Sequence, residues 1–183
     1  MTLWSILFIA IALQADSHSE RSSSGSRASV EVQSKAIKLI DVSGARDRLM
    51  TSFPAIVEQG KAAMRNQCPK CDPAFISEWG KRMMVRLKID DFVHVAAEAY
   101  EKHFTSDELT QLTTFVTSQK AGTPSPLAPA LQKKYSDLLP TIMGEIVGGC
   151  TELGGKLGRD VGTEIEREHP EYFPNSKSAK TQP

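Results

Sequence analysis

Three cysteines are the residues of this chain best suited to chemistry. Cys68 and Cys71 stand in a Cys-Pro-Lys-Cys motif. In an exported protein such a pair is usually an oxidised disulfide, whereas after a strand of a βαβ unit it is typical of a redox-active dithiol. We expect the next helix to begin at Asp72-Pro73, after Cys71, so neither thiol lies in a first helical turn, where the helix dipole most lowers a thiol pKa. A structural disulfide is therefore the favoured interpretation, and thiol–disulfide exchange at Cys68 and Cys71 is the alternative.

Cys150 leaves the disulfide pairing open. It lies on the apolar stripe of the expected last helix, where a free thiol behaves as a small core hydrophobe. A bridge from Cys68 or Cys71 to Cys150 would close a loop of about eighty residues and stabilise the fold more than a bridge across the motif. Zinc would need further ligands, and the histidines lack ligand spacing: His18, His94, His103 and His169. The sequence predicts no metal site and no cofactor.

No catalytic constellation is visible in the sequence. It contains no Gly-x-Ser-x-Gly elbow, no His-Glu-x-x-His and no nucleotide fingerprint. A cluster of glutamates could approach His103 and shift a pKa: Glu98, Glu101 and Glu108. The favoured interpretation is a solvated helix face plus a helix cap. We expect a protein that is not an enzyme.

The stretch around His103 predicts two helices and the corner between them. Thr105 is a suitable N-cap, and Glu108 three residues later completes a capping box. Apolar residues recur at helical spacing on both sides of the corner: Ala96, Tyr100 and Phe104 before it, and Leu109, Leu112 and Phe115 after it. His103 is the residue that neither the cap nor this spacing requires.

Helical periodicity continues through the rest of the folded part. Besides the helix that begins at the Thr105 cap, we expect five helices: Val30–Val42, Ala45–Gln67, one from Asp72-Pro73, one from Asp90 or Asp91 to Phe104, and one from Leu127 to Glu168. Pro54 is expected to kink or divide the second helix, and Pro140 to bend the last. No stretch of the sequence alternates apolar and polar residues as a β-strand does. The sequence predicts an all-α fold, a helical bundle of about five to six helices with a long C-terminal helix.

Glycine recurs at helical steps in that last helix. The glycines form a smooth stripe: Gly144, Gly148, Gly155, Gly158 and Gly162. An apolar stripe runs beside it: Ile142, Ile146, Cys150, Leu153, Leu157, Val161 and Ile165. Because each helical glycine costs roughly 1 kcal/mol relative to alanine, the stripe predicts close contact with another helix, within the fold or across a dimer interface. The alternative is that the helix frays or breaks near 148–149 or 154–155.

The two ends of the chain indicate processing and location. An apolar run covers residues 3–13 and is too short to span a bilayer comfortably, which predicts an export signal cleaved after Ala15 or after Ala12, with an uncleaved anchor as the alternative. We therefore expect a signal peptide at 1–15, a flexible linker at 16–28, a helical domain at 29–168 and a disordered tail at 169–183. Lysine plus arginine number 22, as do aspartate plus glutamate, so no charge field recruits nucleic acid.

A family resemblance is carried by the corner. The segment Tyr100-Glu101-Lys102-His103-Phe104-Thr105, followed by Glu108, Leu109, Leu112 and Phe115, resembles the signature of the bacterial family called domain of unknown function 2059. Residues 38–50 resemble that family's opening helix pair, and the likeness spans about 35–115. The family's Ser-Pro-x-Gly-x-Lys loop is altered here, and the Cys68–Cys71 pair is a local addition. The resemblance implies an exported helical protein and no catalytic residues.

We therefore predict an exported, periplasmic or secreted, helical bundle that acts as a non-enzymatic binding or assembly module. Its partner would be another protein or a second copy of the chain, with membrane contact only through an uncleaved leader. Two alternatives stay open. One is the thiol–disulfide redox protein, and the other is a carrier of a small apolar ligand, which requires an enclosed apolar cavity of about a few hundred Å³.

Overall fold

The computed structural model describes residues 27–123 and 125–173, so the expected signal peptide and most of the expected linker lie outside the described residues. The described part contains six α-helices and a short 3-10 helix, and no strand. They are α1 (Arg27–Ser43), α2 (Ala45–Gln67), α3 (Pro73–Arg86), α4 (Ile89–Glu101), α5 (Ser106–Lys120), α6 (Pro129–Glu168) and η1 (Pro170–Tyr172). The all-α prediction is confirmed.

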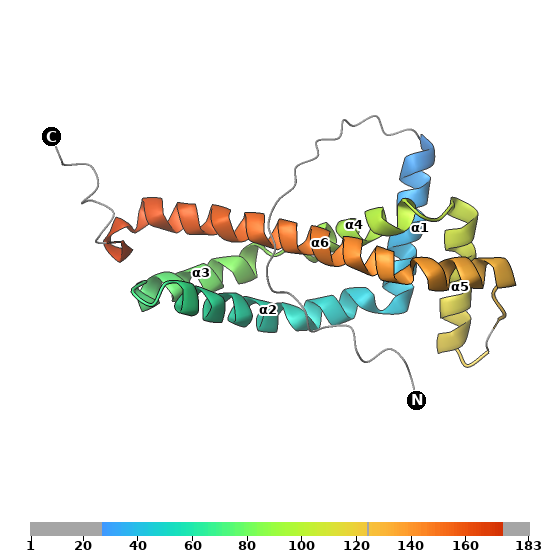
Figure 1. The fold of residues 1–183 in the computed structure, drawn as a ribbon, viewed down its shortest axis with the longest axis horizontal. Coiled ribbons are helices and arrows are strands. Elements are labelled where there is room, and N and C mark those ends of the chain that lie inside the picture. The colour runs from blue at the N-terminus through green and yellow to red at the C-terminus, as the bar shows by residue number, and fades with distance from the viewer. Residues whose placement is uncertain (1–26, 124, 174–183) are drawn as a thin grey trace.

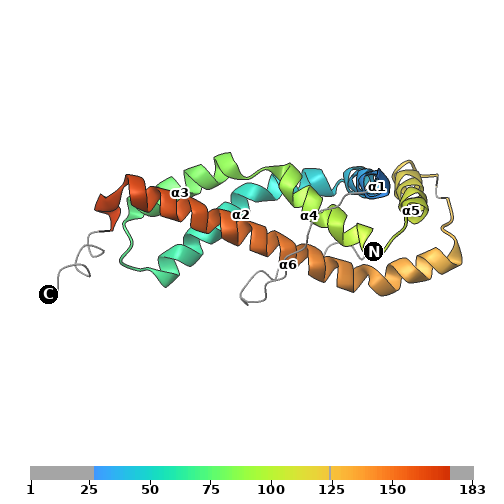
Figure 2. The same cartoon turned by 90° about the horizontal axis from the view of Figure 1, so that it is seen from above.

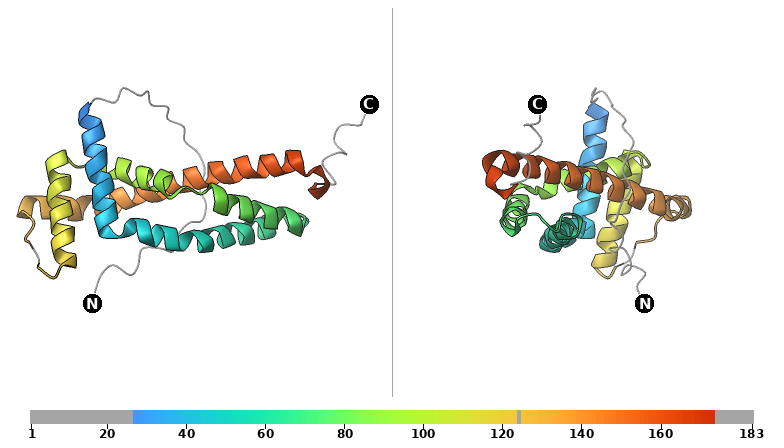
Figure 3. Two further views of the ribbon diagram at one scale, coloured as in Figure 1. Left: turned by 180° about the vertical axis from the view of Figure 1, so that it is seen from behind. Right: turned by 60° about the vertical axis from the view of Figure 1, so that its left-hand side comes forward.

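The helices form an elongated bundle built around α6 (Figure 1). One end of the molecule consists of α1 and α5, which cross the long axis, and the other end is the α2–α3 hairpin, which follows the second half of α6 (Figures 1 and 3). The helix α4 lies along the middle of α6 (Figure 2). The helix α6 therefore joins the two ends of the fold.

Two apolar cores correspond to these two ends. The first lies among α1, α4, α5 and the first half of α6, and its buried residues are Ala36, Leu39, Ile40, Val93, Ala97, Ala99, Phe104, Leu109, Leu112, Leu127, Leu131 and Ile142. The second lies among α2, α3 and the second half of α6, and contains Val57, Phe75, Ile76, Trp79, Met83, Val161 and Ile165. Burial of these side chains is the main stabilising contribution to both ends.

The two predicted helix starts are confirmed. Asp72 caps α3 by accepting a hydrogen bond from the Ala74 amide at 2.7 Å, with Pro73 as the first helical residue. Thr105 and Glu108 form the predicted capping box of α5, in which the Glu108 amide donates to Thr105 Oγ1 and the Thr105 amide donates to Glu108 Oε2. Two amides without intrahelical partners are satisfied in this way.

Prolines and glycines interrupt the helices less than expected. The helix α2 runs through Pro54 without dividing, because buried Phe53 and Val57 anchor it on both sides of the proline. The helix α6 runs through Pro140 and through both glycine pairs, so the alternative interpretation, a helix that frays or breaks near 148–149 or 154–155, is wrong. Packing against α3 and α4 holds α6 helical across residues of poor helix propensity.

The boundaries differ from prediction at several places, including the start of α4, at Ile89 rather than Asp90 or Asp91, and the start of α6, at Pro129 rather than Leu127. The helix α1 begins at Arg27, so residues 27–28 are helical rather than linker. The helix α4 ends at Glu101 rather than Phe104, because the chain turns there to bury Phe104. Residues 169–173 are ordered, contrary to the predicted tail, because the Phe173 ring packs edge-on against Phe75 with centroids 4.9 Å apart. Residues 174–183 of that tail lie outside the described residues.

Candidate functional site

The structure decides the cysteine pairing. Cys68 and Cys71 form the disulfide and Cys150 is the free cysteine, so the alternative bridges to Cys150 are wrong. The bridge closes the turn between α2 and α3, where the Cys71 amide also donates to the Cys68 carbonyl at 3.0 Å. The neighbouring Asp72 carboxylate occupies the α3 N-terminus, so neither cysteine of the pair stands at the helix N-cap or in its first turn. This surrounding favours a structural bridge.

Cys150 lies half-buried on the apolar side of α6. Burial raises the pKa of its thiol above the ordinary value, which keeps the thiol protonated and poorly nucleophilic. Its position fits the predicted role of a small hydrophobic side chain.

His103 contacts α6 through Glu145, and the sequence did not predict this contact. Its Nε2 lies 3.0 Å from Glu145 Oε1, while Lys102 Nζ lies 3.0 Å from the other oxygen of the same carboxylate. Burial alone would raise the pKa of Glu145, but its hydrogen bonds with His103 and Lys102 outweigh burial and lower it. Glu145 is 42 residues away, so no local spacing could have indicated it.

The glutamates expected near His103 have other surroundings. Glu108 completes the α5 cap and forms an ion pair with Lys134 of α6 at 2.8 Å. One oxygen of Glu101 is buried without a hydrogen-bond partner, and burial, then the neighbouring Glu98, raise its pKa. These carboxylates therefore do not form the pKa-shifting cluster around His103.

The other residues of the family-like corner build the first core. Leu109 is fully buried, and the Phe104 ring lies between Tyr100 and Tyr135, with both ring centroids 6.2 Å away. Burial, and then Tyr135, raise the pKa of Tyr100 well above its usual range, so its hydroxyl stays neutral. The corner is explained by packing, capping and three polar contacts to α6, which are Lys102–Glu145, His103–Glu145 and Glu108–Lys134.

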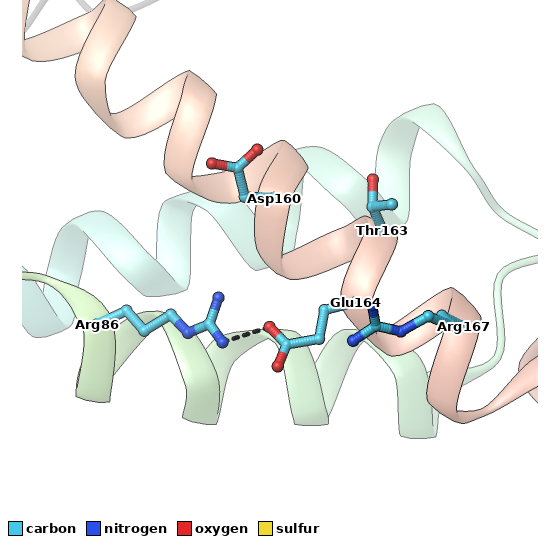
Figure 4. A pocket seen from close by; sticks show the side chains of 5 residues that line it. All are labelled: Arg86, Asp160, Thr163, Glu164 and Arg167. Carbon is cyan, nitrogen blue, oxygen red and sulfur yellow. Dashed lines mark ion pairs between the residues drawn. The ribbon is translucent and has the colours of Figure 1, made fainter.

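Two surface depressions lie beside α6. One, of about 380 Å³, is lined by Arg86, Asp160, Thr163, Glu164 and Arg167 (Figure 4). Figure 4 shows Arg86 of α3 reaching Glu164 of α6 as an ion pair, with Asp160 and Thr163 turned away from it. The other, of about 300 Å³, lies between α4 and α6 and has charged side chains on its rim: Glu98, Lys102, Glu145, Glu152 and Lys156. Both are open and partly charged, so neither is the enclosed apolar cavity that an apolar carrier requires.

The glycine stripe of α6 faces outward along most of its length. Only Gly158 meets another helix as predicted, because a Cβ there would lie 3.3 Å from Trp79 Cζ2. A Cβ at Gly144, Gly148 or Gly162 would meet nothing within 4 Å, and one at Gly155 would meet only the flexible Arg159 guanidinium. The predicted close contact within the fold is therefore wrong at four of the five positions.

A missed glycine makes the closest contact instead. Gly149 faces α4, where a Cβ would lie 2.6 Å from Val95 Cγ1. It stands outside the predicted stripe, one residue after Gly148 and about 100° around the helix. A pattern search restricted to one face could not find it.

The candidate site is the exposed small-residue surface of α6, which we call the α6 face: Gly144, Val147, Gly148, Thr151 and Gly155. At about 100° per residue these positions lie within about 60° of Gly144, on one side of the helix. All five are exposed, and Val147 is 41% exposed although it is apolar. The residues of the α6 face are small and uncharged, with the Arg159 guanidinium lying beside Gly155, and α6 runs along one long side of the molecule (Figure 2).

The described residues hold no group of three or more histidine, cysteine or acidic side chains placed to bind a metal ion. Among the described helices, none has the length and apolar composition needed to cross a bilayer. Comparisons with protein-family models, with curated proteins and with solved structures gave no match. The likeness of residues 35–115 to domain of unknown function 2059 stays a prediction.

Proposed function

We propose that this chain is a non-enzymatic helical assembly module, and that its α6 face packs against a helix of another polypeptide. The outward glycines are the observation that carries the proposal. Four stripe glycines have no helix against them, so they weaken α6 by about 4 kcal/mol relative to alanine. Contact with a partner would offset that cost, because glycines allow two helix backbones to approach unusually closely.

The rest of the α6 face supports a helical partner rather than a small ligand. It is a shallow strip without a cavity, and its side chains are hydrogen, methyl-bearing or hydroxyl groups that fill little space. Thr151 bonds its hydroxyl to the Val147 carbonyl of its own helix at 2.7 Å, which leaves its methyl group available for packing. Such a surface complements another helix more closely than it complements a flexible or charged ligand.

Export stays part of the proposal and rests on the apolar run at residues 3–13, which lies outside the described residues. The partner is then expected in the cell envelope or outside the cell. Redox activity gains no support from the surroundings of Cys71, and no second function is proposed.

A matched pair of threonine variants tests the proposal. Thr151→Lys places a long cation on the α6 face, and Thr163→Lys places the same cation on the same helix about 100° away from it. Envelope extract is passed over the immobilised wild-type chain and both variants. We expect a partner that the wild type and Thr163→Lys retain and Thr151→Lys loses. Equal retention by all three chains contradicts the proposal, and so does retention by none of them if the chain also fails to self-associate.

A further inference from the structure

We infer that the polypeptide on the α6 face is a second copy of this chain, whose α6 lies antiparallel to the first. This inference rests on the proposed function and names the partner. It comes from the charges at the two ends of the α6 face. Lys133 and Asp137 precede it, Arg159 and Glu166 follow it, and all four side chains are exposed. By their helical positions they lie within about 60° of Gly144, on the same side of α6.

The order of these charges is self-complementary when one helix is reversed. Along α6 the signs are positive, negative, positive, negative. An antiparallel second helix presents them in the opposite order, so Lys133 of each copy lies opposite the partner's Glu166. Arg159 then lies three residues, about 4.5 Å along the axis, from the position opposite the partner's Asp137. A parallel second helix would place Lys133 against the partner's Lys133, and like charges in contact oppose association.

The spacing of small residues fits the same arrangement. Eleven residues separate Lys133 from Gly144, and eleven separate Gly155 from Glu166. When Lys133 lies opposite the partner's Glu166, Gly144 therefore lies opposite the partner's Gly155. Gly148 then lies opposite the partner's Thr151. Small residues meet small residues at these glycine and threonine positions, which allows the two helices to approach closely there, while Val147 lies opposite the partner's Glu152.

The charged groups are available for these contacts. Arg159 and Glu166 form no ion pair among the described residues, and Lys133 pairs only with Asp137 of its own helix, at 2.6 Å. Both of those side chains are more than half exposed, so breaking this ion pair to form intermolecular ones costs little free energy.

The size of the surface predicts a weak dimer. From Lys133 to Glu166 the helix is about 50 Å long, and with a width of about 10 Å it covers about 500 Å² per copy. The total of about 1,000 Å² lies at the lower limit for a specific protein interface. We expect dissociation in the micromolar range.

Charge-reversed variants test the arrangement by sedimentation equilibrium of the purified chain at low salt. Lys133→Glu alone and Glu166→Lys alone each place two like-charge pairs in the antiparallel dimer. Each should weaken self-association about tenfold, given the usual strength of exposed pairs. An equimolar mixture of the two variants restores both pairs and should recover wild-type affinity as a heterodimer. Lys81→Glu, an exposed reversal on α3, is the matched control and should leave self-association unchanged.

The outcomes separate this inference from the proposed function. A wild-type chain that stays monomeric up to millimolar concentration overturns the inference, and so does a dimer that ignores both reversals or is not restored by mixing. Retention of a different protein that depends on Thr151 would still support the proposed function. If the chain neither self-associates nor retains a protein in a Thr151-dependent way, both the inference and the proposed function are overturned.

Discussion

Trp79 and Gly158 join α3 to α6 through a hydrogen bond between residues 79 positions apart. The indole Nε1 of Trp79 donates to the Gly158 carbonyl oxygen at 3.0 Å, and the six-membered ring lies against Gly158. The same ring faces Gly60 of α2, where a Cβ would lie 2.8 Å from Cη2. One side chain of α3 thus contacts two other helices, and both contacts require glycine.

Replacing Trp79 should destabilise the second core. Trp79→Phe removes the hydrogen bond, worth about 1 kcal/mol, and leaves unfilled space between α2 and α6. We expect the free energy of unfolding in urea, followed by circular dichroism, to fall by about 2–3 kcal/mol. A loss below about 0.5 kcal/mol would show that the Trp79 contacts contribute little to the fold.

Alanine substitutions at two adjacent glycines of α6 should change the free energy of unfolding in opposite directions. Gly148→Ala adds a methyl group in open space and raises helix propensity, so it should stabilise the monomer by about 0.5–1 kcal/mol. Gly149→Ala places its methyl group 2.6 Å from Val95 Cγ1 and should destabilise the fold by about 1–3 kcal/mol. Thermal unfolding at submicromolar protein concentration measures both changes. Equal shifts for the two variants would contradict the orientation of α6.

The features predicted correctly from sequence are those that local chemistry determines. The caps at Asp72 and Thr105, the helical class and the inward side of α6 at Ile142, Val161 and Ile165 all follow from nearby residues. Helix periodicity and capping act within a few positions, so a single sequence displays them.

The missed features depend on which helices meet. Gly158 and Gly148 have the same spacing and the same propensity, yet Trp79 covers one and nothing in the fold covers the other. His103 likewise has a partner only because α6 returns past the α4–α5 corner and brings Glu145 to it. Contacts over such chain separations follow from tertiary packing, which local patterns do not specify.

Removing the His103 contact should weaken the attachment of the corner to α6. His103→Ala deletes the 3.0 Å contact to Glu145, and Lys102 still holds the carboxylate, so we expect a loss of about 1 kcal/mol. A double-mutant cycle with Glu145→Ala isolates the pair and should give a coupling energy of about 0.5–1 kcal/mol at pH 6. Additive single losses would mean that the two side chains do not interact.

Reduction of the disulfide should cost stability without loss of the fold. The bridge closes a loop of only four residues, for which the chain-entropy model gives about 2 kcal/mol. The Cys68→Ser, Cys71→Ser double variant should lose that amount while its far-ultraviolet circular dichroism stays helical. Cys150→Ser is the control for thiol loss elsewhere. Collapse of the helical signal in the double variant would contradict a purely stabilising role for the bridge.

Acid should weaken the α5–α6 contact through Glu108. Burial would raise the pKa of this carboxyl, but the hydrogen bonds from Lys134 and Thr105 outweigh burial and hold the pKa below the ordinary 4.5. A carboxyl whose pKa is lowered by folding stabilises the fold above its unfolded pKa, and this contribution is lost as pH falls through the folded pKa. Stability should therefore be steady near pH 6 and should decline from about pH 5 downward.

Glu108→Gln isolates this contribution to the acid response. The amide keeps the shape of the side chain and an oxygen for the Thr105 amide, but it cannot form the ion pair with Lys134. The variant should be less stable than the wild type at pH 6, and the difference should shrink as pH falls below 4, because protonation removes the same charge from the wild type. Urea unfolding at pH 6 and at pH 3.5 measures both differences. A difference that stays constant between these pH values would exclude the Glu108 charge as its source.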